Sequence, residues 1–114
     1  MGDGHRLQWE PTGKRIRVDF AGETIVETDG AHVLHETGLP PVYYVPLADI
    51  DAQYLERTDH STRCPFKGQA SYWSVVVGDQ RADNALWGYE DPIEGAEYLK
   101  GFGAFYRDRV EIFD

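Results

Sequence analysis

The sequence contains a single cysteine, Cys64. One cysteine excludes an intrachain disulfide and a four-cysteine zinc site. Secreted domains of this size usually carry several disulfides, and residues 1–6 lack the apolar stretch of a signal peptide. We therefore expect a protein of the reducing cytoplasm.

Basic residues are also scarce, with 11 Lys and Arg against 20 Asp and Glu, which gives a formal net charge of −9. A surface for nucleic acid or anionic lipid needs clustered Lys and Arg, so neither partner is expected. No apolar run approaches the roughly 20 residues of a membrane span. The acidic balance favours solubility without naming a partner.

Metal ligands at a usable spacing are missing as well. His32 and His35 fall in a segment that reads as a strand, where residues i and i+3 point to opposite faces. Joint ligation of one ion by this pair is therefore not expected. We predict no metal and no cofactor.

Aromatic residues are plentiful, with 3 Trp, 7 Tyr and 5 Phe among 114 residues. This length suits one domain of about 100–150 residues, and each buried aromatic side chain can contribute about 150–250 Å² to a small core. Residues 1–13 are polar and contain glycine, which predicts a loose N-terminal arm that Trp9 could anchor. Residues 14–114 are expected to form a single β domain.

Alternation of apolar and polar residues predicts a mainly β fold of antiparallel meanders and hairpins. Ile16, Val18 and Phe20 alternate with charged residues, which is the period of a half-buried strand. Short helices are expected over 49–55, where Asp49 would be the cap, and over 94–100, with a polar loop over 56–65. The predicted strands, of which the first three form a meander and the last two a hairpin, cover residues 14–20, 23–28, 31–36, 42–45, 68–77, 83–89, 103–107 and 110–113.

The run from Thr62 to Gly68 concentrates reactive and backbone-setting residues. Cys64 could act as a nucleophile, since nearby cations favour a thiolate, or it could be a buried apolar residue, as free cysteines often are. Lys67, followed by a strand-opening glycine, could point its ammonium at a phosphate or carboxylate, or lie exposed beside the turn. No phosphate-binding glycine loop precedes it.

Other residues are candidates for lining a ligand site. Arg15 and Arg17 share one strand face and could bind an anion, or pair with the acidic surplus on a solvated face. Glu36 could be an acid or base, or the partner of a cation. Tyr44 and Tyr72 could present polar-tipped rings to a ligand, although one face of the aromatic strands must be core.

Five segments in colinear order carry a further signal: IRVDFAGETIVET, ETGLPPVYYVPLADID, RTDHSTRCPFKGQASYWSV, LWGYEDP and GFGAFYRDRVEIF. From about Arg15 to Phe113 the chain resembles domain-of-unknown-function family 427, which carries a nucleotidyltransferase-type label. The resemblance implies a compact, mostly antiparallel β domain, similar to the β-tent of zinc-containing Mss4-like proteins. The zinc cysteines of those proteins are missing here.

Together these observations favour a small-molecule pocket around the Thr62–Gly68 run. The ligand would be nucleotide-like or otherwise anionic, and the protein could be a transferase-type enzyme or a non-catalytic adaptor that binds a ligand or peptide, as a monomer or homodimer. Cys64 and Lys67 are the predicted catalytic residues. The predicted ligand-binding residues are Arg15, Glu36, Tyr44, Thr62 and Tyr72.

Overall fold

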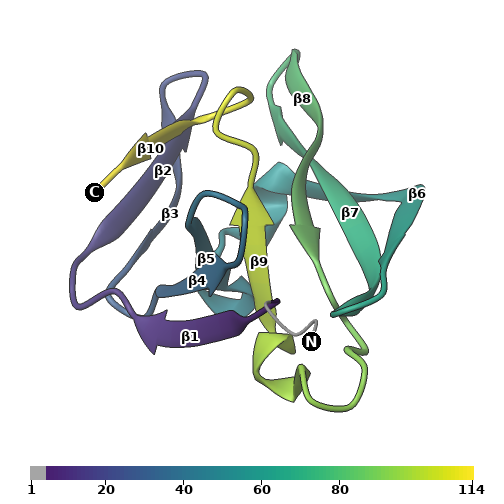
Figure 1. Ribbon diagram of the computed structural model, residues 1–114. Helices are drawn as coiled ribbons and strands as arrows, with labels where there is room; N and C mark the ends of the chain where they lie inside the picture. The colour runs from purple at the N-terminus through teal and green to yellow at the C-terminus, as the bar shows by residue number, and fades with distance from the viewer. Residues whose placement is uncertain (1–4) are drawn as a thin grey trace.

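A computed structural model describes residues 5–114 and has two antiparallel sheets (Figure 1). The predicted mainly β class is confirmed, and helical structure is limited to three single 3₁₀ turns, η1 (Leu47–Asp49), η2 (Ala52–Tyr54) and η3 (Glu97–Leu99). The strands are β1 (Leu7–Pro11), β2 (Ile16–Phe20), β3 (Glu23–Thr28), β4 (His32–Glu36), β5 (Val42–Pro46), β6 (Leu55–Cys64), β7 (Gly68–Val77), β8 (Gln80–Gly88), β9 (Phe102–Phe105) and β10 (Glu111–Phe113).

The larger sheet has seven strands in the order β1-β4-β5-β9-β8-β7-β6, and the smaller one has the order β10-β2-β3. β2 and β3 form the expected hairpin. β4 leaves this meander and pairs with β1 and β5 instead. The predicted closing hairpin is also wrong, because β9 lies between β5 and β8 while β10 pairs with β2. Strand alternation does not encode which strands become neighbours.

Two hydrophobic clusters lie on opposite faces of the larger sheet. The first packs that sheet against the smaller one and includes Ile16, Val18, Ile25, Val45, Leu86 and Phe105. The second includes Leu34, Tyr44, Tyr72, Tyr89, Leu99 and Ala104. Neighbours in sequence, such as Tyr44 and Val45, fall into different clusters because successive strand residues point to opposite faces.

Residues 7–11 are part of the larger sheet, which corrects the predicted loose arm. Backbone pairing with β4 and burial of aromatic rings hold this segment. The Trp9 ring stacks on His32 with centroids 4.8 Å apart and also contacts Tyr44, Tyr98 and Phe102. Backbone pairing and the ring contacts of Trp9 thus stabilise a strand here, although the polar sequence shows little strand pattern. The remainder of the predicted arm, residues 1–4, lies outside the described residues.

Residues 56–65 were expected to be a loop, but most of this segment belongs to β6. β6 is an edge strand of the larger sheet, and seven of its ten residues are exposed. Natural edge strands are often rich in polar and charged side chains, which blunt aggregation. The segment therefore has no apolar alternation that a sequence pattern could detect.

The segment 49–55 is not one helix, because it contains only the last residue of η1 and the single turn η2. Asp51 caps the second turn by accepting a hydrogen bond from the Gln53 N–H at 3.2 Å. Asp49, the predicted cap, instead accepts from the Thr28 hydroxyl at 2.7 Å. Short segments do not sustain an α-helix without tertiary packing. None of the helical turns in residues 5–114 is long and apolar enough to cross a membrane.

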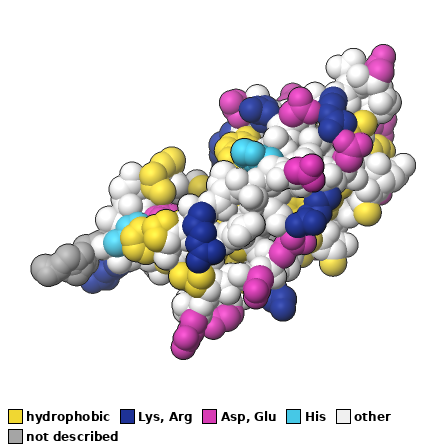
Figure 2. Space-filling view, turned by 90° about the vertical axis from the view of Figure 1, so that its right-hand side faces the viewer, with side chains coloured by type: hydrophobic (Ala, Val, Ile, Leu, Met, Phe, Trp, Pro, Cys, Tyr) yellow, Lys and Arg dark blue, Asp and Glu magenta, His cyan; other side chains and the backbone are white. Residues whose placement is uncertain are grey.

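The face that carries β6, β7 and β8 has acidic and basic side chains interspersed over it (Figure 2). Arg57 donates to Glu90 at 2.6 Å, and Arg81 pairs with Glu56. All four side chains are more than 40 % exposed. Exposed pairs of this kind stabilise a fold by only about 0–1 kcal/mol each.

Candidate functional site

The turn between β6 and β7 brings Cys64 and Lys67 to the same side of the chain. Lys67 donates its backbone N–H to the Cys64 carbonyl oxygen at 3.2 Å, which closes the turn around Pro65 and Phe66. Gly68 then begins β7 with φ of +118°, a conformation that favours glycine. As a result the Lys67 Nζ lies 3.9 Å from the Cys64 Sγ.

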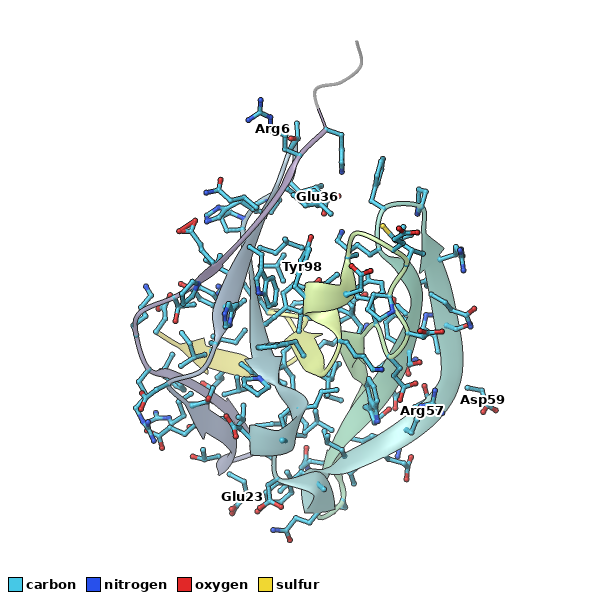
Figure 3. The ribbon with its side chains drawn as sticks, turned by 90° about the horizontal axis from the view of Figure 1, so that it is seen from below. Arg6, Glu23, Glu36, Arg57, Asp59 and Tyr98 are labelled. Atoms are coloured by element: carbon cyan, nitrogen blue, oxygen red, sulfur yellow. The ribbon has the colours of Figure 1, made fainter. Side chains whose placement is uncertain are left out.

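Lys67 is buried, with 7 % of its surface exposed, and its ammonium meets the carboxylate of Glu36. Nζ donates to Oε1 at 2.5 Å, and both side chains are 9 % exposed. Glu36 ends β4, on the far side of the sheet order from β7. In Figure 3, Glu36 lies in the upper part of the view near Arg6 and Tyr98 lies nearer the centre, whereas Arg57 and Asp59 lie toward the margin formed by β6. The ion pair therefore joins two distant parts of the sheet.

His5 completes a group of four side chains that we call the Lys67 cluster: His5, Glu36, Cys64 and Lys67. The His5 Nε2 lies 3.1 Å from the Glu36 Oε2, so the two carboxylate oxygens have different partners. The imidazole also stacks on Phe66, with centroids 3.8 Å apart. Sequence reasoning missed His5, because it lies in a polar segment with no motif around it.

A small cavity of about 130 Å³, the Tyr44 pocket, opens beside Lys67 and Glu36. An ammonium has three N–H donors; Glu36 takes one and the Cys64 sulfur is near a second. The remaining donor can serve a group inside the pocket. Apolar side chains form most of its wall. The pocket is lined by Leu34, Glu36, Leu39, Pro40, Val42, Tyr44, Lys67, Trp87 and Tyr89.

The two tyrosines of the Tyr44 pocket are held in the protonated form. Burial raises the pKa of Tyr44 above its usual value, and the neighbouring Trp87 side chain offsets this only in part. Burial, together with Tyr44 and Cys64, raises the pKa of Tyr89 in the same direction. Protonated hydroxyls can donate hydrogen bonds, so this pocket offers donors to a ligand oxygen.

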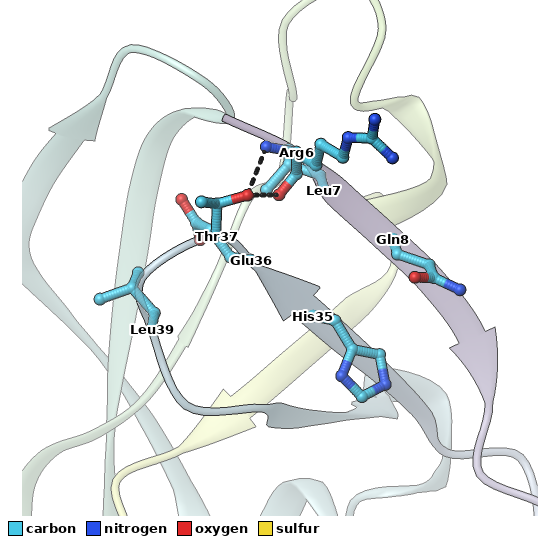
Figure 4. A pocket seen from close by; sticks show the side chains of 7 residues that line it. All are labelled: Arg6, Leu7, Gln8, His35, Glu36, Thr37 and Leu39. Atoms are coloured by element: carbon cyan, nitrogen blue, oxygen red, sulfur yellow. Dashed lines mark hydrogen bonds between the residues drawn. The ribbon is translucent and has the colours of Figure 1, made fainter. Parts of the chain in front are cut away.

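A wider hollow of about 570 Å³ lies next to the Tyr44 pocket and shares Glu36 and Leu39 with it. Arg6, Leu7 and Gln8 line it from the β1 side, and residues 35–37 line it from the end of β4 and the turn after it (Figure 4). The Thr37 hydroxyl accepts a hydrogen bond from the Arg6 N–H at 2.8 Å, which holds the two sides together. A ligand too large for the inner pocket could extend into this hollow.

Tyr72 and Thr62 lie together but do not line the Tyr44 pocket. Their hydroxyl oxygens are 2.9 Å apart, and the His60 ring lies 4.4 Å from the Tyr72 ring. Tyr72 is buried in the same hydrophobic cluster as Tyr44. In this position Tyr72 and Thr62 can support the wall behind the pocket.

Arg15 is not brought to the Lys67 cluster. Its guanidinium pairs with Glu27 at 3.0 Å and with Asp29 at 2.8 Å, both on the β2–β3 side. Asp29 and Glu27 together raise the pKa of Arg15. Its side chain is 53 % exposed and lines none of the described hollows. The two carboxylates therefore neutralise the charge that would attract an external anion.

Residues 5–114 contain no group of three His, Cys, Asp or Glu side chains placed to hold a metal ion. The Lys67 cluster has the groups for other chemistry: a sulfur that can act as nucleophile, a cation that can stabilise negative charge, and a carboxylate and imidazole that can carry protons. A sequence model described as Domain of unknown function (DUF427) matches residues 8–114. The chain belongs to this family. No curated protein matches the chain.

The DUF427 match spans every strand except the first residue of β1, so it includes Glu36, the turn at Cys64–Lys67 and the whole Tyr44 pocket. His5 lies just before the matched segment. The core of the candidate site thus lies within the matched segment, whereas His5 lies outside it.

Replacing Tyr44 by phenylalanine should make stability less sensitive to alkaline pH. An unfolded tyrosine ionises near pH 10, whereas burial raises the folded pKa of Tyr44. Above about pH 10 the unfolded state therefore holds fewer protons, and stability falls as pH rises toward the folded pKa. Urea unfolding between pH 8 and pH 11 should give a shallower loss for Tyr44→Phe than for the wild type. Equal slopes would contradict this assignment.

Proposed function

We propose that the protein binds a small molecule through an anionic or strongly polarised oxygen in the Tyr44 pocket. The observation that carries this proposal is the buried Lys67 ammonium, which lines the pocket. Two of its three N–H groups have Glu36 and Cys64 as partners, and the third has no partner among the described residues. A buried charged group is costly to desolvate, and ionisable groups in such settings are enriched at functional sites. The second partner of Glu36, His5, would keep that carboxylate paired while Lys67 turns to the ligand.

The size of the pocket limits which part of a ligand can enter it. Small-molecule sites usually measure about 300–1,000 Å³, and the Tyr44 pocket measures about 130 Å³. A phosphate, a carboxylate or a single ring would fit, with Trp87 and Val42 as apolar walls. The rest of a nucleotide-like ligand would occupy the wider hollow beside Leu39. This division favours a ligand with a compact anionic head.

Charge changes at Leu39 test the proposal without breaking the buried ion pair. Leu39 lines the pocket and is 59 % exposed, so the fold should tolerate a polar residue there. A thermal-shift screen would use nucleotides and small carboxylates with their nucleoside and amide analogues, since a ligand of the folded state raises the melting temperature. Leu39→Lys should tighten binding of an anionic hit about tenfold, and Leu39→Asp should weaken it by a similar factor.

Lys67→Met should abolish binding of the same hit, whereas Lys100→Met, at an exposed lysine, should leave it unchanged. Binding of the neutral analogues should not respond to the Leu39 changes. An anionic hit whose affinity is the same in all Leu39 and Lys67 variants would show that the ligand binds elsewhere. A screen without any hit would remove the basis for an anion site.

Catalysis is a second candidate, and the 3.9 Å approach of Cys64 to Lys67 favours it. Cys64 would form a bond to an electrophilic carbon or phosphorus of the ligand as the bond to the leaving group breaks. The thiol proton would pass to Glu36 or His5, and Lys67 would stabilise the negative charge on the leaving group. Conversion of the hit by the wild type, lost in Cys64→Ser while binding persists, would separate an enzyme from an adaptor. The nucleotidyltransferase-type family label makes nucleotides the first substrates to try. The same thiol suits a reducing cytoplasm, which is the setting we propose.

A further inference from the structure

A second hollow, separate from the Lys67 cluster, has the features of an anion site. We call it the Tyr43 groove, and it measures about 540 Å³, within the usual range for small-molecule sites. Its cations are Lys14, from the link between β1 and β2, and Arg107, from the segment after β9. Three prolines give it rigid apolar walls. The residues that define the groove are Pro11, Lys14, Pro40, Pro41, Tyr43 and Arg107.

Both cations converge on the ring of Tyr43. The Lys14 Nζ lies 5.8 Å from the ring centroid, and the Arg107 guanidinium carbon lies 5.2 Å from it. This arrangement is notable in a protein with a net charge of −9. Among residues 5–114, no carboxylate forms an ion pair with Arg107, and Lys14 pairs only with Asp114. Glu10 also lines the groove, but it forms no ion pair with Lys14 or Arg107 among the described residues, so Asp114 is the carboxylate that meets these cations.

Asp114 already places a carboxylate at this site. Its Oδ2 accepts a hydrogen bond from the Tyr43 hydroxyl at 2.8 Å and lies 3.8 Å from the Lys14 Nζ. The hydrogen bond from Tyr43, followed by Lys14 and more weakly by Arg107, holds the pKa of the Asp114 carboxyl below its usual value. Asp114 itself is 46 % exposed, so an external group can compete with it. Glu10 and His35, 3.4 Å apart, are the other titratable groups of the groove.

We propose that the Tyr43 groove is a binding site for a carboxylate group of another molecule, and that Asp114 is its intramolecular occupant. The Tyr43 hydroxyl and the two cations bind the incoming carboxylate, and the prolines contact the apolar part of the molecule that carries it. The ligand displaces Asp114 from Tyr43. The apparent affinity of the wild type for the ligand is therefore the intrinsic affinity multiplied by the fraction of time that the site is free of Asp114.

Removal of the intramolecular competitor tests this proposal. The probe is benzoate, with benzamide as its neutral counterpart, and binding is measured from backbone amide and Arg107 Nε–H chemical shifts. Asp114→Asn keeps the size of the side chain but removes its charge, so it should bind benzoate at least fivefold more tightly than the wild type. Asp114→Glu keeps the competitor and should behave like the wild type. Benzamide should not bind either variant.

A second pair of variants tests the cations. Adding Lys14→Met or Arg107→Met to Asp114→Asn should weaken benzoate binding at least fivefold. Both side chains are exposed, so the variants should stay folded and give the spectra of a folded protein. The proposal is overturned if Asp114→Asn gives no gain, if benzamide binds as well as benzoate, or if benzoate binds no tighter than about 10 mM to Asp114→Asn. A capped peptide with one aspartate, run in parallel, decides whether the carboxylate comes from a polypeptide or a free acid, by which of the two binds more tightly.

Discussion

Lys67→Met is expected to lower the free energy of unfolding by about 3–5 kcal/mol, because removing one member of a buried ion pair leaves the other charge without a partner. Glu36 and Lys67 are both 9 % exposed, and their side chains join β4 to the β6–β7 turn. For a domain of this size such a loss corresponds to a fall in melting temperature of roughly 10–20 °C. Urea unfolding followed by circular dichroism measures the free energy of unfolding, and a thermal scan measures the melting temperature.

The double variant Glu36→Met/Lys67→Met tests whether the loss of stability comes from the unpaired charge that each single variant leaves. Replacing a whole buried pair by apolar residues is often close to neutral, so the double variant should be more stable than either single variant. Arg81→Met serves as the control, since its exposed pair with Glu56 should change stability by about 1 kcal/mol or less. Strictly additive losses in the double variant would mean that Glu36 and Lys67 do not stabilise each other.

Gly68→Ala is expected to lower the free energy of unfolding by about 2–4 kcal/mol. It should also weaken the binding of any ligand that contacts Lys67. At φ of +118° an L-residue is strained, by about 1–3 kcal/mol at such positions. A Cβ would also lie 3.2 Å from the backbone nitrogen of Ile93. That N–H donates to the Lys67 carbonyl oxygen at 3.0 Å. The added methyl group therefore pushes against the hydrogen bond that fixes the backbone of Lys67 and weakens it.

Gly101→Ala is the matched control for this prediction. Gly101 has φ of +84°, and a Cβ there would meet nothing within 4 Å. Gly101→Ala should therefore lower the free energy of unfolding only through backbone strain, by about 1–2 kcal/mol. Chemical denaturation of both variants, with the Lys67 and Ile93 amide resonances followed by NMR, checks the mechanism. Equal losses, or an unchanged Ile93 amide in Gly68→Ala, would contradict the proposed clash.

The strands with alternating apolar residues could be predicted from the sequence, and their partners could not. Ile16 and Val18 mark β2 because one face of the strand enters the core between the two sheets. β1 and β6 were missed, since their stability comes from pairing at sheet edges and, for β1, from the rings around Trp9. Backbone pairing of this kind leaves little trace in side-chain polarity.

The candidate site was partly accessible to sequence reasoning for a related reason. Cys64 and Lys67 lie in one tight turn, so their proximity follows from a local motif. The contact of Glu36 with Lys67 was one of several alternatives, because 31 residues separate them in the chain. Arg15 shares a charge type with Lys67, but its neighbours on the adjacent strand neutralise it. Only tertiary structure distinguishes these two cations.

The pairing of β10 with β2 has a consequence for how the chain folds. Ile112 lies opposite Val18, so the smaller sheet joins segments from the two ends of the described chain. Closing the long loop between these two strands costs conformational entropy, so the contact becomes favourable only once most of the chain is ordered. β proteins dominated by such distant pairings reach the native state in about milliseconds to seconds, much more slowly than helical bundles. Assembly of the first hydrophobic cluster, which includes Ile16 and Val18 of β2, is therefore expected to set the folding rate.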